Sequence, residues 1–175
     1  MQNKVVLAGA GTMGASLAQV YAQAGWDTVL YNRSASGLER AKNLIELNQA
    51  TFVKEEILSE EESKTLLARI KMTTEKADFT DAALVVESIV EKLDAKQEFW
   101  GEISQIVPED ALLATNTSGL HITDIAKACK YPERFMGQHW LNPPHLLSLC
   151  EIIAGEKTSP ENVQKMRSLV ESLGK

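Results

Sequence analysis

The stretch NKVVLAGAGTMG (residues 3–14) carries an apolar, strand-like run directly into three glycines, Gly9, Gly11 and Gly14, with the spacing G-x-G-x-x-G. Helical apolar spacing follows at once. In this setting the first glycine allows a tight turn, the second lets a pyrophosphate approach the backbone, and the third brings helix and strand together. The helix N-terminus then faces the anion with its free amide groups. The stretch therefore predicts a dinucleotide-binding loop; the alternative is a glycine-rich turn without a ligand.

Strand-like and helical segments alternate along the rest of the chain. Strands are expected at 3–9, 27–32, 83–88, 111–118, 134–142 and 149–155, and helices at 12–24, 92–107, 122–129 and 160–173. Apolar strands separated by amphipathic helices indicate a parallel sheet covered on both faces, since each parallel pair needs a crossover helix. The sequence thus predicts an α/β fold with a Rossmann-like, doubly wound, mostly parallel sheet.

A longer helical region is expected after the second strand, from Gly37 to Ala68. Ser59 is a candidate N-cap inside it, and three glutamates follow in the first turn, where the helix dipole favours negative charge. We interpret residues 37–69 as a helical hairpin inserted between the second and third strands, the third being 83–88.

Composition limits the possible partners. The 175 residues carry a net charge of −6 and a pI near 5.2, so a nucleic acid or an anionic membrane surface is not expected to bind. Cys129 and Cys150 are the only cysteines, which suggests neither a disulfide framework nor a zinc site. No secretion signal and no apolar run long enough to span a membrane are apparent. We expect one domain covering residues 1–175, a cytoplasmic setting and a small-molecule substrate.

The end of the second strand bears on cofactor choice. An acidic residue is expected there when the adenosine ribose has a free 2′-hydroxyl, but Asn32 stands at that place, 18 residues after Gly14, followed by Arg33 and Ser34. An amide does not repel a 2′-phosphate, and an adjacent guanidinium and hydroxyl can bind one. These residues favour NADP. Alternatively, Arg33 stacks on adenine while Asn32 bonds the ribose.

Two of the three histidines, His139 and His145, lie within the segment GQHWLNPPH (137–145), on either side of its Asn-Pro-Pro turn. The preceding residues have the apolar content of a strand, and Pro143 and Pro144 must end it because proline donates no ladder hydrogen bond. His139 therefore lies near a strand end.

The next expected strand, 149–155, contains one carboxylate, Glu151. If the two strands pair antiparallel about residue 145, His139 and Glu151 lie opposite each other. A carboxylate on one ring nitrogen fixes the tautomer and favours the imidazolium, which is a general-base arrangement. The alternative is a buried structural histidine with Glu151 at a sheet edge.

Several motifs in order resemble one family, the 3-hydroxyacyl-CoA dehydrogenases, in their N-terminal nucleotide-binding domain. The motifs are VVLAGAGTMGASLAQVYAQAG, LVVESIVEKLDAKQEFW, ATNTSGLHITDIA and PERFMGQHWLNPPHLLSLCEII. The resemblance covers nearly the whole chain. It implies a further helical domain, absent from this chain, which closes the substrate cleft and forms a homodimer.

The resemblance also implies roles for individual residues. His139 would be the catalytic base, Glu151 its orienting partner, and Ser118 and Asn142 would touch the substrate or the nicotinamide. The implied reaction interconverts 3-hydroxyacyl-CoA and 3-ketoacyl-CoA with NAD. The expected cofactor-binding residues are Gly9, Gly11, Thr12, Met13, Gly14, Asn32, Arg33, Ser34, Glu91, Lys96, Ser118 and Asn142.

The chain departs from the family pattern in three places. Asn32 replaces the usual acid, the segment 38–56 has few of the lysines that meet coenzyme A phosphates, and NPPH also resembles gulonate and carnitine dehydrogenases. A dehydrogenase of small, non-CoA 3-hydroxy acids is therefore the nearest alternative function. A non-catalytic dinucleotide-binding module is the other, and it would need no His139–Glu151 pair.

Overall fold

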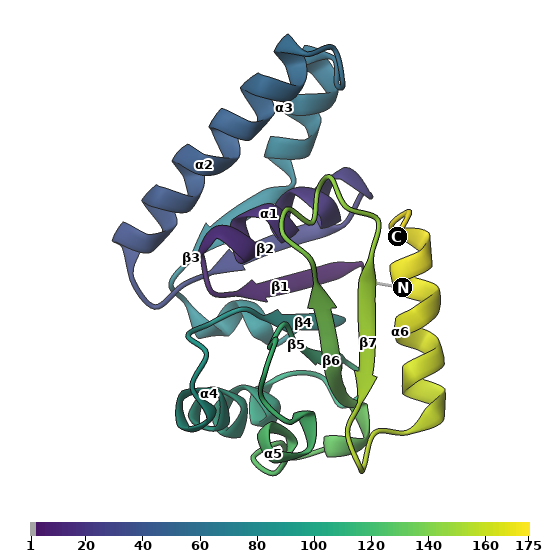
Figure 1. Ribbon diagram of the computed structural model, residues 1–175. Helices are drawn as coiled ribbons and strands as arrows, with labels where there is room; N and C mark the ends of the chain where they lie inside the picture. Colours follow the sequence, from purple (N-terminus) through teal and green to yellow (C-terminus); the bar gives the residue numbers. More distant parts are fainter. Residues whose placement is uncertain (1–2) are drawn as a thin grey trace.

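One sheet of seven strands organises the computed structural model, which describes residues 3–175 (Figure 1). In spatial order the strands are β3 (Ile70–Thr73), β2 (Asp27–Tyr31), β1 (Lys4–Ala8), β4 (Leu84–Glu87), β5 (Leu112–Thr115), β6 (Phe135–Trp140) and β7 (Cys150–Ala154). The first six are parallel, and β7 is antiparallel to β6. The strand order reverses between β1 and β4, and in open α/β sheets ligands bind at the carboxyl ends of the strands at such a reversal. The predicted doubly wound, mostly parallel fold is confirmed.

Side chains alternate between two cores on the two faces of the sheet. On β1, Val5 and Leu7 join the core on one face, and Val6 and Ala8 join the core on the other. The first core is closed by α1 (Thr12–Gln23), α2 (Ala35–Lys54) and α6 (Pro160–Ser172), the second by α4 (Leu93–Ile106) and α5 (Ile122–Ala126). Both faces of the parallel strands β1, β2, β4 and β5 are therefore buried, as their continuous apolar sequences require.

The helical hairpin after β2 projects from the body of the domain as α2 and α3 (Glu60–Ala68) (Figure 1). Ser59 caps α3 as expected: its hydroxyl accepts from the Glu62 amide, and the Glu62 carboxylate accepts from the Ser59 amide. Buried hydrogen bonds between amide and hydroxyl side chains connect the hairpin to α1. Ser63 donates to Gln49, and Gln49 donates to Gln19 of α1, both at 2.9 Å.

The prediction that 83–88 is the third strand was wrong. Residues 70–73 form β3, which pairs with β2 at the edge of the sheet, so the hairpin lies between β2 and β3. Four residues with one buried side chain carry too weak an apolar pattern to identify from the sequence. Pairing with β2 decides their conformation. Two short 3-10 turns, Lys76–Phe79 and Pro132–Arg134, complete the elements.

Within residues 3–175, no helix is both long enough and apolar enough to cross a membrane.

Candidate active site

The glycine loop leaves the carboxyl end of β1 in the geometry that its spacing predicts. Gly9 has φ of +107°, and a Cβ there would lie 2.6 Å from the Ser88 carbonyl oxygen. A Cβ on Gly14 would lie 1.8 Å from the Gly9 carbonyl oxygen. Gly11, by contrast, has nothing within 4 Å of an added Cβ, so the loop is open to a ligand at this residue.

Helix α1 begins beside this opening without a side-chain cap. Its N-cap is Gly11, and no acidic residue lies in its first turn, which contains Thr12 and Met13. The backbone amides of that turn are therefore free to bind an anion, and the helix dipole favours negative charge there. These features fit the pyrophosphate of a dinucleotide.

Asn32 follows β2 directly and is tied to its own loop. Its side-chain Nδ2 donates to the backbone oxygen of Ser34 at 3.0 Å and to the Ser34 hydroxyl at 3.1 Å, while its Oδ1 accepts from the Ala10 amide at 3.4 Å. Arg33 and Ser34 are exposed. The place where a carboxylate would meet the ribose is thus neutral, with one exposed guanidinium beside it.

His139 and Glu151 form a close pair at the same edge of the sheet. They are directly opposite in the antiparallel register of β6 and β7, and Nδ1 of His139 lies 2.6 Å from Oε2 of Glu151. The His139 side chain is 20% exposed and that of Glu151 55%. The predicted antiparallel register and the predicted contact between these two side chains are confirmed. With Nδ1 engaged by the carboxylate, Nε2 is the nitrogen left to exchange a proton with a ligand.

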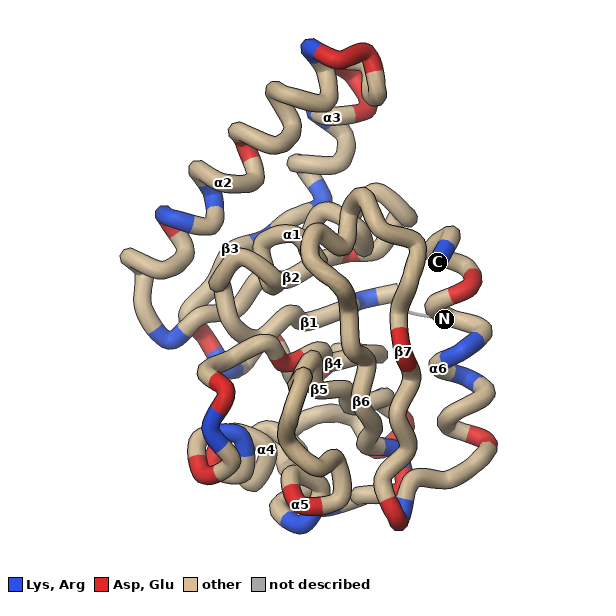
Figure 2. Tube along the Cα trace, in the orientation of Figure 1, with Lys and Arg blue, Asp and Glu red and all other residues tan. Residues whose placement is uncertain are grey.

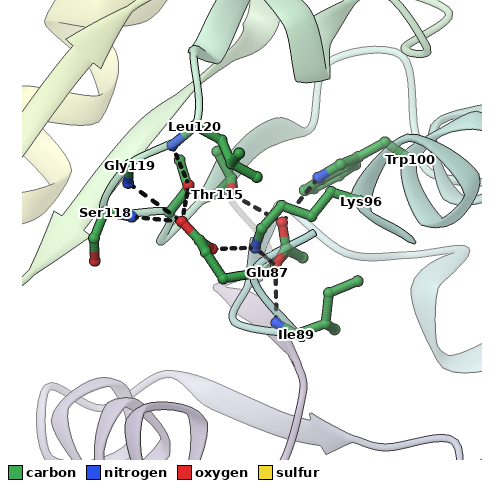
Figure 3. A network of polar contacts seen from close by, with 10 residues as sticks. Glu87, Ile89, Lys96, Trp100, Thr115, Ser118, Gly119 and Leu120 are labelled. Carbon is green, nitrogen blue, oxygen red and sulfur yellow. Dashed lines mark hydrogen bonds and ion pairs between the residues drawn. The ribbon is translucent and has the colours of Figure 1, made fainter. Parts of the chain in front are cut away.

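Glu91 and Lys96 belong to one network of polar contacts (Figure 3). The buried Lys96 ammonium lies 3.3 Å from Oε2 of Glu91 and 2.5 Å from Oε1 of Glu87. The other oxygen of Glu91 accepts from the Thr117 hydroxyl and from the amides of Ser118 and Gly119, the amides at 3.0 and 3.3 Å. The structure thus joins Glu91, Lys96 and the backbone of Ser118, three of the residues that the sequence pointed to.

The carboxyl group of Glu91 is held in its ionised form. Its partial burial acts to raise the pKa, but the Thr117 hydroxyl, the Lys96 ammonium and the Gly119 amide outweigh burial and lower the pKa below its ordinary value. Glu91 is therefore a fixed negative charge between two loops at the carboxyl edge of the sheet.

Ser118 and Asn142 are exposed and lie in different loops. Ser118 follows β5, and Asn142 precedes Pro143 in the connection between β6 and β7. Both connections leave or enter the sheet at the edge that carries the glycine loop and His139, because β1, β5 and β6 are parallel.

Sequence reasoning missed the centre of the network, Glu87. This carboxylate is fully buried and accepts hydrogen bonds from the Thr115 hydroxyl at 2.8 Å and from the Trp100 indole at 3.3 Å, besides its contact with Lys96. The available signal was an acidic residue ending an otherwise apolar strand, ALVVES, because a buried charge needs a partner. Its side-chain partners come from α4 and β5 and could not be read from local sequence.

The fold and this edge define a class: a Rossmann-type domain that binds a nicotinamide dinucleotide, of the kind found in dehydrogenases. Comparison with known families assigns the chain to one family within this class. Residues 4–175 match the model of the 3-hydroxyacyl-CoA dehydrogenase NAD binding domain, so the chain belongs to that family.

Individual relatives agree with this assignment. A probable 3-hydroxybutyryl-CoA dehydrogenase from Deinococcus radiodurans is 40% identical over 167 residues, 95% of this chain and 60% of the relative. The crystal structure of (S)-3-hydroxybutyryl-CoA dehydrogenase from Ralstonia eutropha superposes with a TM-score of 0.96 at 32% identity, covering 100% of this chain and 62% of that one.

A relative with another substrate also matches nearly the whole chain. The 5-formyl-3-hydroxy-2-methylpyridine 4-carboxylate 5-dehydrogenase of Mesorhizobium japonicum is 31% identical over 175 residues, 99% of this chain and 56% of the relative. The chain thus spans about 60% of the length of each of these three relatives.

Proposed function

We propose that the protein containing this chain is a nicotinamide-dependent 3-hydroxyacyl-CoA dehydrogenase, which interconverts a 3-hydroxyacyl and a 3-ketoacyl thioester. The observation that carries the proposal is the His139–Glu151 pair, with 2.6 Å between Nδ1 and Oε2, at the sheet edge that bears the open glycine loop. A binding module without catalysis has no use for such a pair in that place. The nicotinamide cofactor supplies a hydride acceptor or donor when bound.

His139 serves as the general base in the oxidative direction. Its Nε2 takes the proton of the 3-hydroxyl, and the resulting imidazolium is stabilised by the Glu151 carboxylate on the opposite nitrogen. In the reductive direction the same nitrogen returns the proton to the ketone oxygen. Glu151 acts by holding one tautomer and one ring orientation, since Nδ1 must carry the proton that Glu151 accepts.

Ser118 and Asn142 contact the reacting oxygen or the carboxamide of the cofactor in this proposal. Both are exposed, polar and located on loops at the carboxyl edge, where donors can stabilise a developing alkoxide. Glu91 and Lys96 border the same loops. The glycine loop and the first turn of α1 hold the pyrophosphate.

The test is an assay of the complete gene product with short 3-hydroxyacyl-CoA and 3-ketoacyl-CoA substrates, with matched free hydroxy acids as competitors. Turnover of the thioesters supports the proposal. Turnover of free acids alone contradicts it, and so does dinucleotide binding without turnover of any hydroxy compound. Light scattering of the same preparation tests the expected homodimer.

One feature favours the second candidate, a dehydrogenase of small hydroxy acids that lack CoA. The hairpin segment 35–69 contains seven acidic and five basic residues, and Glu55, Glu56, Glu60 and Glu61 are exposed around its turn. Figure 2 shows this acidic end of the hairpin. Such a surface repels the phosphates of coenzyme A. Weak binding of CoA itself, measured with and without salt, would favour this candidate.

Cofactor choice within the nicotinamides is also proposed. The neutral Asn32 and exposed Arg33 support acceptance of a 2′-phosphate, so that NADP binds at least as well as NAD. The ratio of the dissociation constants for NADPH and NADH measures this directly, and a strong preference for NADH would contradict it.

A further inference from the structure

A buried ion pair between Glu87 and Lys96 lies beside the glycine loop and has no role in the proton transfer proposed above. Glu87 is the last residue of β4, in register with Ala8 on one side and Thr115 on the other. Its side chain is 0% exposed and that of Lys96 1%. A charged pair therefore occupies the strand row that immediately precedes Gly9.

The pair is fully provided with hydrogen-bond partners. Glu87 accepts from four donors: Lys96 Nζ at 2.5 Å, the Ile89 amide and the Thr115 hydroxyl at 2.8 Å, and the Trp100 indole at 3.3 Å. Burial of two charges is costly even when they are paired, and apolar residues of similar size often stabilise a fold as well or better. Stability alone therefore gives little reason for a charged pair here.

Lys96 carries the connection onward to a loop at the carboxyl edge. Its ammonium contacts Glu87 and Glu91, and Glu91 in turn accepts from the Ser118 and Gly119 amides. In Figure 3 these groups form one continuous line of contacts from β4 to the loop after β5. Glu91 is 45% exposed at its side chain, so it lies where the buried pair meets solvent.

We propose that Glu87 is a positioning residue: by fixing the Lys96 ammonium it holds Glu91, and Glu91 holds the Thr117–Gly119 loop in the conformation that presents Ser118 to the nicotinamide. The proposal rests on the assigned role of Ser118 for its functional consequence. The proposal also has a structural part, which is that the buried pair controls the conformation of the loop. This part can be measured in the chain without any ligand.

The experiment compares three variants of this chain. Glu87→Gln leaves the buried Lys96 ammonium with only the Glu91 carboxylate beside it, and Lys96→Met leaves the buried Glu87 carboxylate without a counter-charge, so both variants melt at lower temperature. The double variant Glu87→Gln/Lys96→Met removes both charges. In it, the glutamine can still accept from the Ile89 amide and donate to the Thr115 hydroxyl, and only the Trp100 indole loses its acceptor, so the melting temperature recovers part of the way toward that of the unmodified chain.

Two further readouts separate positioning from a merely structural role. In the double variant we expect hydrogen exchange at the Ser118 and Gly119 amides to be about tenfold faster. This corresponds to a decrease of ~1.4 kcal/mol in the free energy of local opening. We also expect the dissociation constant for the preferred nicotinamide cofactor to rise by about tenfold. Recovered melting together with unchanged exchange at both amides would overturn the proposal. Faster exchange with unchanged cofactor affinity would support control of the loop and reject its link to the nicotinamide.

Glu91→Gln keeps the inference falsifiable if the double variant does not fold, because it leaves the buried pair intact. It should reproduce the faster exchange at Ser118 and Gly119, and normal exchange there would defeat the proposal. Glu98→Gln, on the exposed side of α4, is the matched control and should change neither readout. If His139 proved not to be the catalytic base, the hydrogen-exchange results at Ser118 and Gly119 would be unchanged. Failure of the proposed function and failure of the positioning role of Glu87 can therefore be told apart.

Discussion

His139 and Glu151 are separated by twelve residues in sequence and by 2.6 Å between Nδ1 and Oε2 in the structure. The Pro143–Pro144 segment ends β6, and the chain returns as β7 in the one register that sets the two side chains face to face. In the proposed function, this pair gives the carboxyl edge of the sheet a base whose tautomer the carboxylate fixes. Its position at the sheet edge that also carries the open glycine loop is what makes a nucleotide-binding domain a candidate dehydrogenase.

Replacing His139 by glutamine should abolish most turnover of the complete protein while leaving the cofactor bound. Glutamine keeps the polarity and approximate size of the side chain but cannot take up a proton, and general-base catalysis contributes about 10²- to 10⁴-fold. The checks are kcat and the dissociation constant for the cofactor. His121→Gln, at the exposed start of α5, is the control with unchanged turnover. Full activity in His139→Gln would remove the catalytic assignment.

Alanine at two glycines of the loop should separate an effect on folding from an effect on cofactor binding. Gly14→Ala places a Cβ 1.8 Å from a backbone oxygen, and overpacking of this kind costs about 1–3 kcal/mol or more, so the melting temperature falls. Gly11→Ala meets nothing within 4 Å, so the fold is unaffected, but the methyl group obstructs the pyrophosphate and the cofactor binds more weakly. Calorimetry and fluorescence titration measure the two effects. Normal cofactor affinity in Gly11→Ala would show that the pyrophosphate lies elsewhere.

Asn32→Asp should shift cofactor preference toward NADH. A carboxylate at this place accepts from both ribose hydroxyls and repels a 2′-phosphate, so the ratio of NADPH to NADH dissociation constants should rise by about tenfold or more. Arg33→Ala should weaken NADPH binding and leave NADH binding nearly unchanged, since it removes a charge-assisted contact to the phosphate alone. Equal responses of both cofactors to Arg33→Ala would instead favour the stacking of Arg33 on adenine.

Glu91 should make stability depend on pH in acid. Its pKa in the folded chain is lower than the ordinary 4.5, because the Thr117 hydroxyl and the Lys96 ammonium outweigh the opposing effect of burial. The ionised group therefore contributes stability that is fully present above the unfolded pKa and is lost as the pH falls through the lower folded pKa. The melting-temperature difference between the unmodified chain and Glu91→Gln should shrink as the pH falls from about 6 to 3. A constant difference would show that the charge of Glu91 contributes nothing.

Some features of the fold and the site could be predicted from local sequence, and others could not. The three glycines and the apolar run before them predicted the loop, because their spacing follows from the turn and from helix–strand contact. The pairing of His139 with Glu151 was also accessible, since two prolines end one strand and alternation sets the register of the next. In contrast, β3 was missed, because its four residues become a strand only by pairing with β2.

Apart from β3, the sequence by itself determined the order of strands and helices, the glycine loop and the identity of the paired histidine and glutamate. All of these depend on periodicity and on residues near each other in the chain. Only the tertiary structure decided that Glu87, Lys96, Glu91 and the loop after β5 form one network, and that Asn32 bonds its own loop. The physical reason is that a buried charge chooses partners by distance and geometry. The members of this network come from β4, α4, β5 and the loops that follow the two strands, and the parallel packing of β4 and β5 brings the ends of these strands together.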